Sequence, residues 1–378
     1  MSTMDGPPPM NVLLITCDQW RADALSCAGH PLVSTPNLDR LAAEGVRFAN
    51  HFNQATPCGP SRASLYTGMY QLNHRVVANG TPLAQRHTNI ALELRRAGYD
   101  PVLSGYTDQA HDPSTSQGAL DPVLHYYGDS LPGMRSLNTF PGGSSGHLAT
   151  SWVQWLTELG YDVPEEMIPT GPYGIGKFAS VEQHGAMLGG DPAEVLNPDT
   201  SFTHALDADG VPGAAFYKAE HSDTAFAVNQ VLSYVGSRRG APWACHLSAF
   251  KPHAPLLAAH PFNTHYSPED AGLPPHRAAT IEEEGRLHPW LAHRLTQRAG
   301  VAPEDDEALK VLRSQYFAVC EEADDQLGRL FDELRSAGEW DRTLVIFTTD
   351  RKATAAVPFR SLRKTSDSSC ARRRRAAR

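Results

Sequence analysis

Apolar or β-branched runs alternate along this chain with longer segments of helical periodicity. The runs read as buried strands and lie at Asn11–Thr16, Asp100–Ser104, Trp243–Phe250 and Thr343–Thr348. The helical segments lie at Pro36–Gly45, Asn89–Gly98, Asp223–Ser237 and Ala308–Gly338. Strands that alternate with helices form a mainly parallel sheet with helices on both faces. The sequence therefore predicts the α/β fold class.

Polar residues follow each predicted strand at once. They are Asp18 and Gln19, Gly105 to Asp108, Lys251 and His253, and Asp350. In parallel α/β sheets the ligand site lies beyond the carboxyl ends of the strands. Any one of these sets is explained as well by the start of a loop. Four such sets follow four strands, and two of the sets begin with Asp. A shared ligand site is therefore as good an explanation as four separate loop starts.

The composition limits the class of protein. With 41% hydrophobic and 20% charged residues among 378, the chain resembles a soluble globular protein with an ample core. No apolar run is long enough to span a bilayer, and residues 1–10 lack the pattern of a signal peptide. The six cysteines are scattered without a CxxC pair, which favours reduced thiols. We therefore expect a cytoplasmic protein that does not bind membranes.

Residues Thr56–Gly68, TPCGPSRASLYTG, contain a lone cysteine in an unusual setting. Pro60 suits the first turn of a helix, which places Cys58 just before the helix N-terminus, where backbone N–H groups favour an anion. Arg62, one turn further on, can direct two hydrogen bonds at a tetrahedral oxyanion. Cys58 is then a nucleophile beside an anion cradle, or a buried cysteine that packs. A plain thiolate nucleophile also stays open, although thiolate phosphatases use a longer Cys-to-Arg loop.

Cys58–Gly68 resembles the signature of the type I sulfatases, C-x-P-S-R-x-x-x-x-T-G, over eleven residues. Asn11–Asp18, Thr35–Phe48 and Lys251–His253 resemble further landmarks of that family, which belongs to the alkaline phosphatase superfamily. The resemblance extends from about Asn11 to Asp350. Asp18-Gln19, where many sulfatases have two aspartates, is similar to the branch of phosphonate monoester hydrolases and phosphodiesterases. An alkaline phosphatase-like fold is therefore expected.

The resemblance implies that a formylglycine-generating system oxidises Cys58 to formylglycine, whose hydrate attacks sulfur or phosphorus. One divalent cation, Ca²⁺, Mn²⁺ or Mg²⁺ with Zn²⁺ as an alternative, would activate that hydroxyl. The implied metal ligands are Asp18, Gln19, residue 58 and Asp350. The other implied catalytic residues are Arg62, Lys251 and His253. Weaker candidates for contacts to the substrate are Asn79, Tyr106 and Thr107.

The expected activity is hydrolysis of a small sulfate ester, phosphonate monoester or phosphodiester. Expulsion of sulfate or phosphate by the second hydroxyl of the hydrate would let one site serve both ester classes. We expect a catalytic domain at 1–350, in which loop-rich residues 107–223 cover the site. A homo-oligomer is compatible with the sequence and is left open.

The last residues differ from the rest of the chain. Residues 351–378 contain ten Lys or Arg and one acid, whereas residues 1–350 contain 41 acidic and 23 basic residues. Asp350 is followed by Arg351, where the family has His or Asn, so we expect a frameshift that leaves the C-terminal part of the domain missing and the tail disordered. The alternative function is a truncated, inactive relative that at most binds oxyanions. Nucleic-acid binding by Arg372–Arg375 is disfavoured, because no folded module accompanies the charge.

Overall fold

The computed structural model describes residues 10–109, 112, 114, 130–138, 148–163, 214–238, 240–254, 256–275, 281–289, 292–293 and 305–350. The chain forms two compact units, of which the larger comprises Met1–Leu273 and Ala302–Ala353. Within the second unit the structure describes one short helix, α10 (Ile281–Gly285). The predicted tail 351–378 and much of the predicted insertion 107–223 lie outside the described residues. The predicted site residues belong to the larger unit, whose fold is described below.

Among the described residues, five parallel strands form one sheet, in the order β3-β2-β4-β1-β5. Their bounds are β1 (Asn11–Cys17), β2 (Val102–Ser104), β3 (Arg135–Ser136), β4 (Ala244–Ala249) and β5 (Thr343–Thr349). All four predicted strands are present within two residues of the expected bounds, which confirms the α/β class. β3 has only two residues, which is too short for an apolar period to reveal in the sequence.

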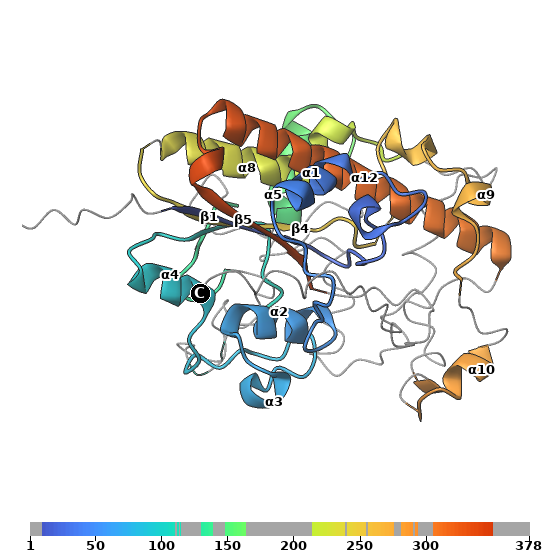
Figure 1. Cartoon of the computed structure of the whole chain (residues 1–378), viewed down its shortest axis with the longest axis horizontal. Coiled ribbons are helices and arrows are strands. Elements are labelled where there is room, and N and C mark those ends of the chain that lie inside the picture. Colours follow the sequence, from blue (N-terminus) through green and yellow to red (C-terminus); the bar gives the residue numbers. More distant parts are fainter. Residues whose placement is uncertain are drawn as a thin grey trace, which may run out of the picture. The chain divides into compact units, whose positions relative to one another are not determined.

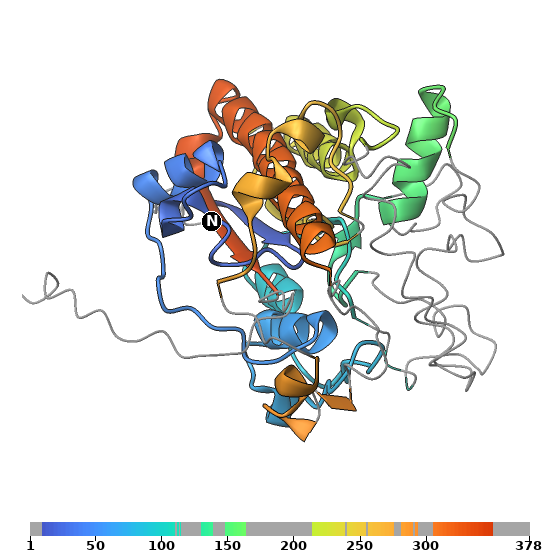
Figure 2. The same ribbon diagram turned by 90° about the vertical axis from the view of Figure 1, so that its right-hand side faces the viewer.

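One face of the sheet is covered by α1 (Pro36–Glu44), α8 (Asp223–Ser237) and the long helix α12 (Asp306–Ser336), all shown on one side of the strands in Figure 1. Here Leu13 and Ile15 of β1 share a core with Leu327 and Phe331 of α12, all without solvent exposure. Figure 2 shows the same layers from the side. Alternate residues of each strand point to this face, and the apolar side of each helix packs against them.

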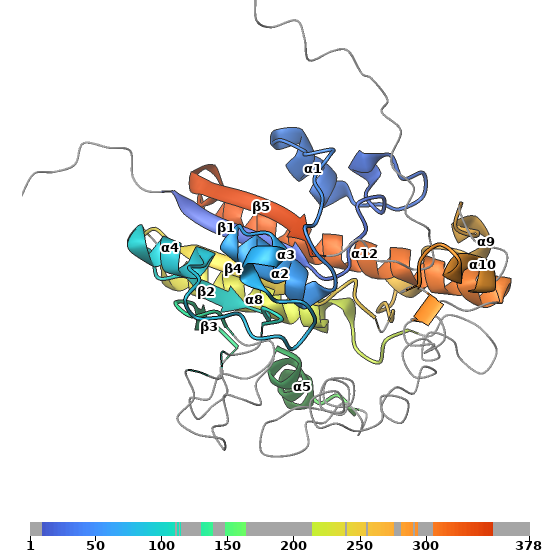
Figure 3. The same ribbon diagram turned by 90° about the horizontal axis from the view of Figure 1, so that it is seen from below.

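The opposite face is covered by α2 (Cys58–Thr67) and α4 (Ile90–Arg96), with α3 (Gln71–His74) against α2, as Figure 3 shows. A smaller core forms here, in which Ala63 and Tyr66 of α2 and Ala91 of α4 lie with Leu103 of β2. The neighbouring Val102 belongs to the other core. Helices therefore lie on both faces, as predicted from the alternation of strands and helices.

Side-chain caps explain where several helices begin. Asn89 accepts from the backbone N–H of Ala91 at 2.9 Å at the start of α4, and Ser222 and Asp305 cap α8 and α12 in the same way. The remaining helices are α5 (Leu148–Glu158), α9 (Pro268–Ala271), η1 (Ser26–Ala28), η6 (Ala219–His221), η7 (Phe262–Thr264) and η8 (Trp340–Arg342). α5 lies within the segment predicted to be loops. Among the described residues no helix is both long and apolar enough to cross a membrane.

Candidate active site

The strand register brings two carboxylates to one edge of the sheet. Cys17, the last residue of β1, is level with Ala249 of β4 and Thr349 of β5. Asp18 and Asp350, the next residues of β1 and β5, therefore emerge side by side, and the backbone N–H of Asp18 donates to the carbonyl of Ala249 at 3.1 Å. This is the edge at which the sequence predicted a shared site.

α2 supplies the third member of the cluster. It begins at Cys58 itself rather than after it, with Pro57 in the N-cap position, so Cys58 lies in the first turn. No side chain caps the helix at Pro57, but the amide oxygen of Asn79 accepts from Gly59 N–H at 2.9 Å. Asn79, a predicted substrate contact, thus holds the start of α2.

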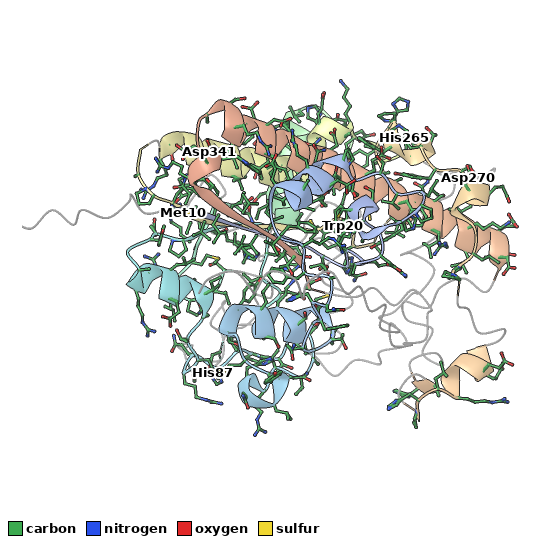
Figure 4. The ribbon with its side chains drawn as sticks, viewed as in Figure 1. Met10, Trp20, His87, His265, Asp270 and Asp341 are labelled. Atoms are coloured by element: carbon green, nitrogen blue, oxygen red, sulfur yellow. The ribbon has the colours of Figure 1, made fainter. Side chains whose placement is uncertain are left out.

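Asp18, Cys58 and Asp350 converge to form a candidate metal centre. Each offers one ligand atom, these atoms lie within 4.8 Å of one another, and all three residues are buried. The thiol of Cys58 donates to Asp18 Oδ1 at 3.4 Å. Gln19, the fourth predicted ligand, adopts a φ of 60° and enters the cluster through its backbone N–H, which donates to Asp350 Oδ1 at 3.2 Å. Trp20, labelled in Figure 4, anchors this turn by packing edge-on against Phe347 of β5, with ring centroids 5.7 Å apart.

Arg62 lies under the cluster with its guanidinium completely buried. Its Nε donates to Asp350 Oδ2, and its Nη1 donates to the Ser248 hydroxyl at 2.7 Å and to the Tyr106 carbonyl at 3.1 Å. Its Nη2 lies 3.6 Å from Asp18 Oδ2 and has no hydrogen-bond partner among the described residues. One arm of the guanidinium therefore stays available for another acceptor at the cluster.

The pKa values of the two carboxylates are moved in opposite directions. Burial by itself raises the pKa of Asp18, but the charges of His253 and Arg62 and the hydrogen bond from Tyr106 outweigh it and hold this pKa below its usual range. Burial raises the pKa of Asp350 to about 7, although Arg62 opposes this. A single guanidinium beside two buried carboxylates thus leaves one carboxylate that keeps its proton more tightly in the metal-free protein.

The Cys58 thiol is a poor nucleophile in this setting. Burial and the carboxylates of Asp18, Asp350 and Asp108 raise its pKa well above the usual range. A reactive cysteine needs the opposite environment, one that stabilises the thiolate. The unmodified thiol therefore does not match the plain thiolate nucleophile that the sequence left open.

Tyr106 and Thr107 follow β2 and are both buried. The Tyr106 hydroxyl donates to Asp18 Oδ2, and its ring lies under the Arg62 guanidinium at 4.5 Å. These two contacts tie Tyr106 to the cluster, and its contact with substrate stays a prediction. The substrate contact of Thr107 stays a prediction.

Lys251 and His253 follow β4, as predicted, and lie in different surroundings. The Lys251 ammonium binds Glu322 of α12 and lies 4.0 Å from Asp223 of α8. Burial lowers the pKa of Lys251, but Glu322 and Asp223 outweigh it and the net shift is upward. The His253 ring stacks on Phe250 at 4.6 Å, and its Nδ1–H donates to the Ala254 carbonyl at 2.6 Å. The charge of His253 is felt by Asp18.

Sequence reasoning missed Ser248, Glu322 and Asp223. Ser248 is inside a strand, and the two acids lie on helices that the sequence reveals only through their apolar periodicity. Their proximity depends on how β4, α8 and α12 pack. The alternation of the strand would have shown that Ser248 shares a face with His246, but not that Arg62 reaches it.

The parallel sheet with helices on both faces is an α/β fold of the alkaline phosphatase-like class, and the comparisons with known proteins give the chain the lineage of ester hydrolases. The chain belongs to the sulfatase family: the family model "Sulfatase" matches residues 10–368, a range that continues beyond Asp350. The resemblance on which the sequence prediction rested is thereby confirmed.

A curated protein and two solved structures are similar to most of this chain. The chain is 35% identical over 359 residues to the "Multifunctional alkaline phosphatase superfamily protein PehA" of Trinickia caryophylli, covering 90% of this chain and 62% of that protein. It is also similar to the crystal structure of phosphonate monoester hydrolase of Agrobacterium radiobacter, with 36% identity and a TM-score of 0.70, and to phosphonate monoester hydrolase SpPMH from Silicibacter pomeroyi, with 34% and 0.71. Each alignment covers 90% of this chain and 62% of the solved chain. The chain thus spans 62% of the length of these relatives.

Proposed function

We propose that this site hydrolyses sulfate esters, or phosphonate monoesters and phosphodiesters, with a formylglycine formed from Cys58 and one divalent cation. The observation that carries the proposal is the convergence of Asp18, Cys58 and Asp350, whose ligand atoms lie within 4.8 Å of one another, beside Arg62, which pairs with both carboxylates. Two carboxylates and a guanidinium arm at a helix start are suited to holding a cation and an oxyanion together. The sulfatase family model supports sulfate esters, and the titles of the two similar structures support phosphonate monoesters.

The donor set fits a hard divalent cation. Asp18, Asp350, the amide oxygen of Gln19 and an oxygen on residue 58 would hold it, and oxygen ligands suit Ca²⁺, Mg²⁺ or Mn²⁺. A role for such an ion is supported by two buried carboxylates that both pair with the one guanidinium of Arg62. When bound, the cation supplies Lewis-acid polarisation of the transferred group.

Three residues of the chain would then have different roles in the reaction. Modified residue 58 supplies an oxygen nucleophile, which is consistent with a raised thiol pKa that disfavours direct attack by sulfur. Arg62, fixed through Nε and Nη1, directs Nη2 at an oxygen of the modified residue or of the transferred group. Tyr106 donates to Asp18 and keeps that carboxylate oriented.

Two predicted residues remain to be placed in the reaction. His253, whose Nδ1 is tied to the Ala254 carbonyl, presents Nε2 as the nitrogen that would protonate the leaving oxygen. Lys251 would act on the transferred group by its charge, from a position held by Glu322. Asn79, whose amide oxygen contacts the first turn of α2, and Thr107, which follows β2, are proposed substrate contacts.

The test is the mass of the peptide that spans residue 58, combined with turnover. The full chain, produced with and without a formylglycine-generating system, is assayed with 4-nitrophenyl sulfate and a 4-nitrophenyl phosphonate in Mn²⁺ or Ca²⁺. We expect turnover only in the batch that carries the modification, and none in a Cys58→Ala variant. Complete modification without turnover of either ester would contradict the proposal and favour an oxyanion-binding relative.

A further inference from the structure

Ser248 of β4 is the least expected partner of Arg62. Its hydroxyl accepts from Arg62 Nη1 at 2.7 Å and from the Thr16 hydroxyl at 3.1 Å. Thr16 and Ser248 are direct neighbours across β1 and β4, and neither is exposed to solvent. A serine hydroxyl rotates freely unless its lone pairs are engaged. Thr16 occupies one of them and leaves the other toward Arg62.

A third residue continues the chain of hydrogen bonds. His246 lies two residues before Ser248 on the same face of β4, and its Nε2 is 3.0 Å from the Thr16 hydroxyl oxygen. Burial, and then the charge of Arg62, lowers the pKa of His246 to about 3, so the ring is neutral. Its Nδ1 is buried and has no hydrogen-bond partner in the part of the chain that the structure describes.

The direction of the chain follows from these contacts. A neutral imidazole carries one N–H, and leaving that donor buried without an acceptor is costly. The proton therefore belongs on Nε2, and the bare Nδ1 is the unpartnered nitrogen. Nε2–H then donates to Thr16, Thr16 donates to Ser248, and Ser248 keeps a lone pair for Arg62.

We infer that His246, Thr16 and Ser248 are positioning residues that orient the guanidinium of Arg62. This inference rests on the proposed function, in which Arg62 Nη2 contacts the reacting group. In this role the three residues would not contact the substrate. They hold the Ser248 hydroxyl as the acceptor for Arg62 Nη1. The guanidinium is thereby fixed with Nη2 directed at the cluster of Asp18, Cys58 and Asp350.

Thr16 offers a matched pair of variants. Thr16→Val removes the hydroxyl and keeps the shape, whereas Thr16→Ser keeps the hydroxyl and loses a methyl. We expect Thr16→Val to lower kcat for a 4-nitrophenyl phosphonate about tenfold relative to Thr16→Ser, with a smaller change in KM. His246→Gln, whose amide can donate from the same place as Nε2, should retain more kcat than His246→Leu. Equal kcat for Thr16→Val and Thr16→Ser, both folded, would overturn the inference.

A second measurement does not depend on turnover. Nitrogen-15 spectra of the histidine-labelled full chain should show His246 as the neutral Nε2–H tautomer without titration between about pH 5 and 8. Thr16→Val should alter this signal, while Thr16→Ser should preserve it. An Nδ1–H tautomer in the parent chain would overturn the inference even if the proposed hydrolysis were established. Conversely, if the protein shows the expected spectra but no turnover, the hydrogen bonds from His246 to Ser248 are supported and only the proposed hydrolysis is contradicted.

Discussion

Arg62 of α2 and Asp350 at the end of β5 form a hydrogen-bonded ion pair in which both side chains are completely buried, although 288 positions separate them. The pair ties the helix that carries Cys58 to the strand that carries a predicted metal ligand. Because the guanidinium also reaches Ser248 and the Tyr106 carbonyl, one side chain connects α2, β2, β4 and β5. The geometry of the site therefore depends strongly on Arg62.

Arg62→Lys keeps the positive charge and removes the planar fork. A single ammonium cannot serve Asp350, Ser248 and Tyr106 together, so we expect the free energy of unfolding to fall by about 3 kcal/mol and turnover to fall about 100-fold. Denaturant titration and steady-state kinetics measure the two effects. Arg40→Lys is the control, because Arg40 pairs with Asp332 at the surface, where such pairs contribute less than about 1 kcal/mol. Equal losses in both variants would contradict the role given to Arg62.

Metal affinity should depend on pH through Asp350. Its folded pKa of about 7 lies above its unfolded value near 3.8, so its contribution to the stability of the metal-free chain is present at low pH and is lost as the pH rises through about 7. A bound cation needs the ionised carboxylate and displaces the proton. We expect the Mn²⁺ or Ca²⁺ association constant to rise roughly tenfold per pH unit between about pH 5.5 and 7, then level off. Calorimetry in buffers of different ionisation enthalpy counts the proton, and a flat profile would exclude this carboxylate as a ligand.

The unmodified Cys58 thiol should resist alkylation. Burial and three nearby carboxylates raise its pKa, so the thiolate fraction at neutral pH is very small. We expect reaction with iodoacetamide to be about 100-fold slower at Cys58 than at a free exposed thiol, measured by peptide mass in the native chain. Cys27 provides an internal comparison, because it is only partly buried. Rapid and selective labelling of Cys58 would restore the thiolate nucleophile as a mechanism.

The sequence predicted the carboxyl edge of the sheet correctly because strand ends can be located from local patterns. Asp18 and Asp350 follow strands whose apolar runs are clear, and a parallel register then brings them together. The contacts of Lys251 could not be predicted in this way, because Glu322 lies 71 residues away on α12 and faces Lys251 only through helix packing. Likewise, Asn79 was assigned to substrate from resemblance, and its hydrogen bond to Gly59 appears only in three dimensions.

Glu322→Gln should destabilise the chain. The carboxylate of Glu322 is buried, binds the Lys251 ammonium and accepts from Ala259 N–H at 3.0 Å. Removing its charge leaves Lys251 with Asp223 at 4.0 Å, so we expect a loss of about 3 kcal/mol in the free energy of unfolding. A Lys251→Met/Glu322→Leu double variant should recover part of that loss, because the ion pair is removed as a unit, while Asp223 and the Ala259 N–H lose a buried partner.

The same double variant separates the two roles of Lys251. If the ammonium acts on the transferred group, the double variant folds but loses turnover. If the ion pair only supports the packing of β4 on α12, turnover returns together with stability. We expect the loss of turnover, and full activity in the stable double variant would remove Lys251 from the catalytic set.

Gly105 lies between β2 and Tyr106 at a place that has no room for a side chain. It adopts a φ of 116°, and a Cβ built there would lie 2.0 Å from the Ser248 carbonyl oxygen. Gly105→Ala therefore forces β2 and β4 apart at the edge where the Tyr106 carbonyl receives Arg62, and we expect a loss of more than about 3 kcal/mol. Gly29→Ala is the matched control, because Gly29 has a φ of 94° with nothing within 4 Å of the added carbon, and only backbone strain of about 1 kcal/mol is expected. Thermal unfolding of the two variants separates the clash from the strain, and similar midpoints would show that β2 and β4 do not approach as closely as described.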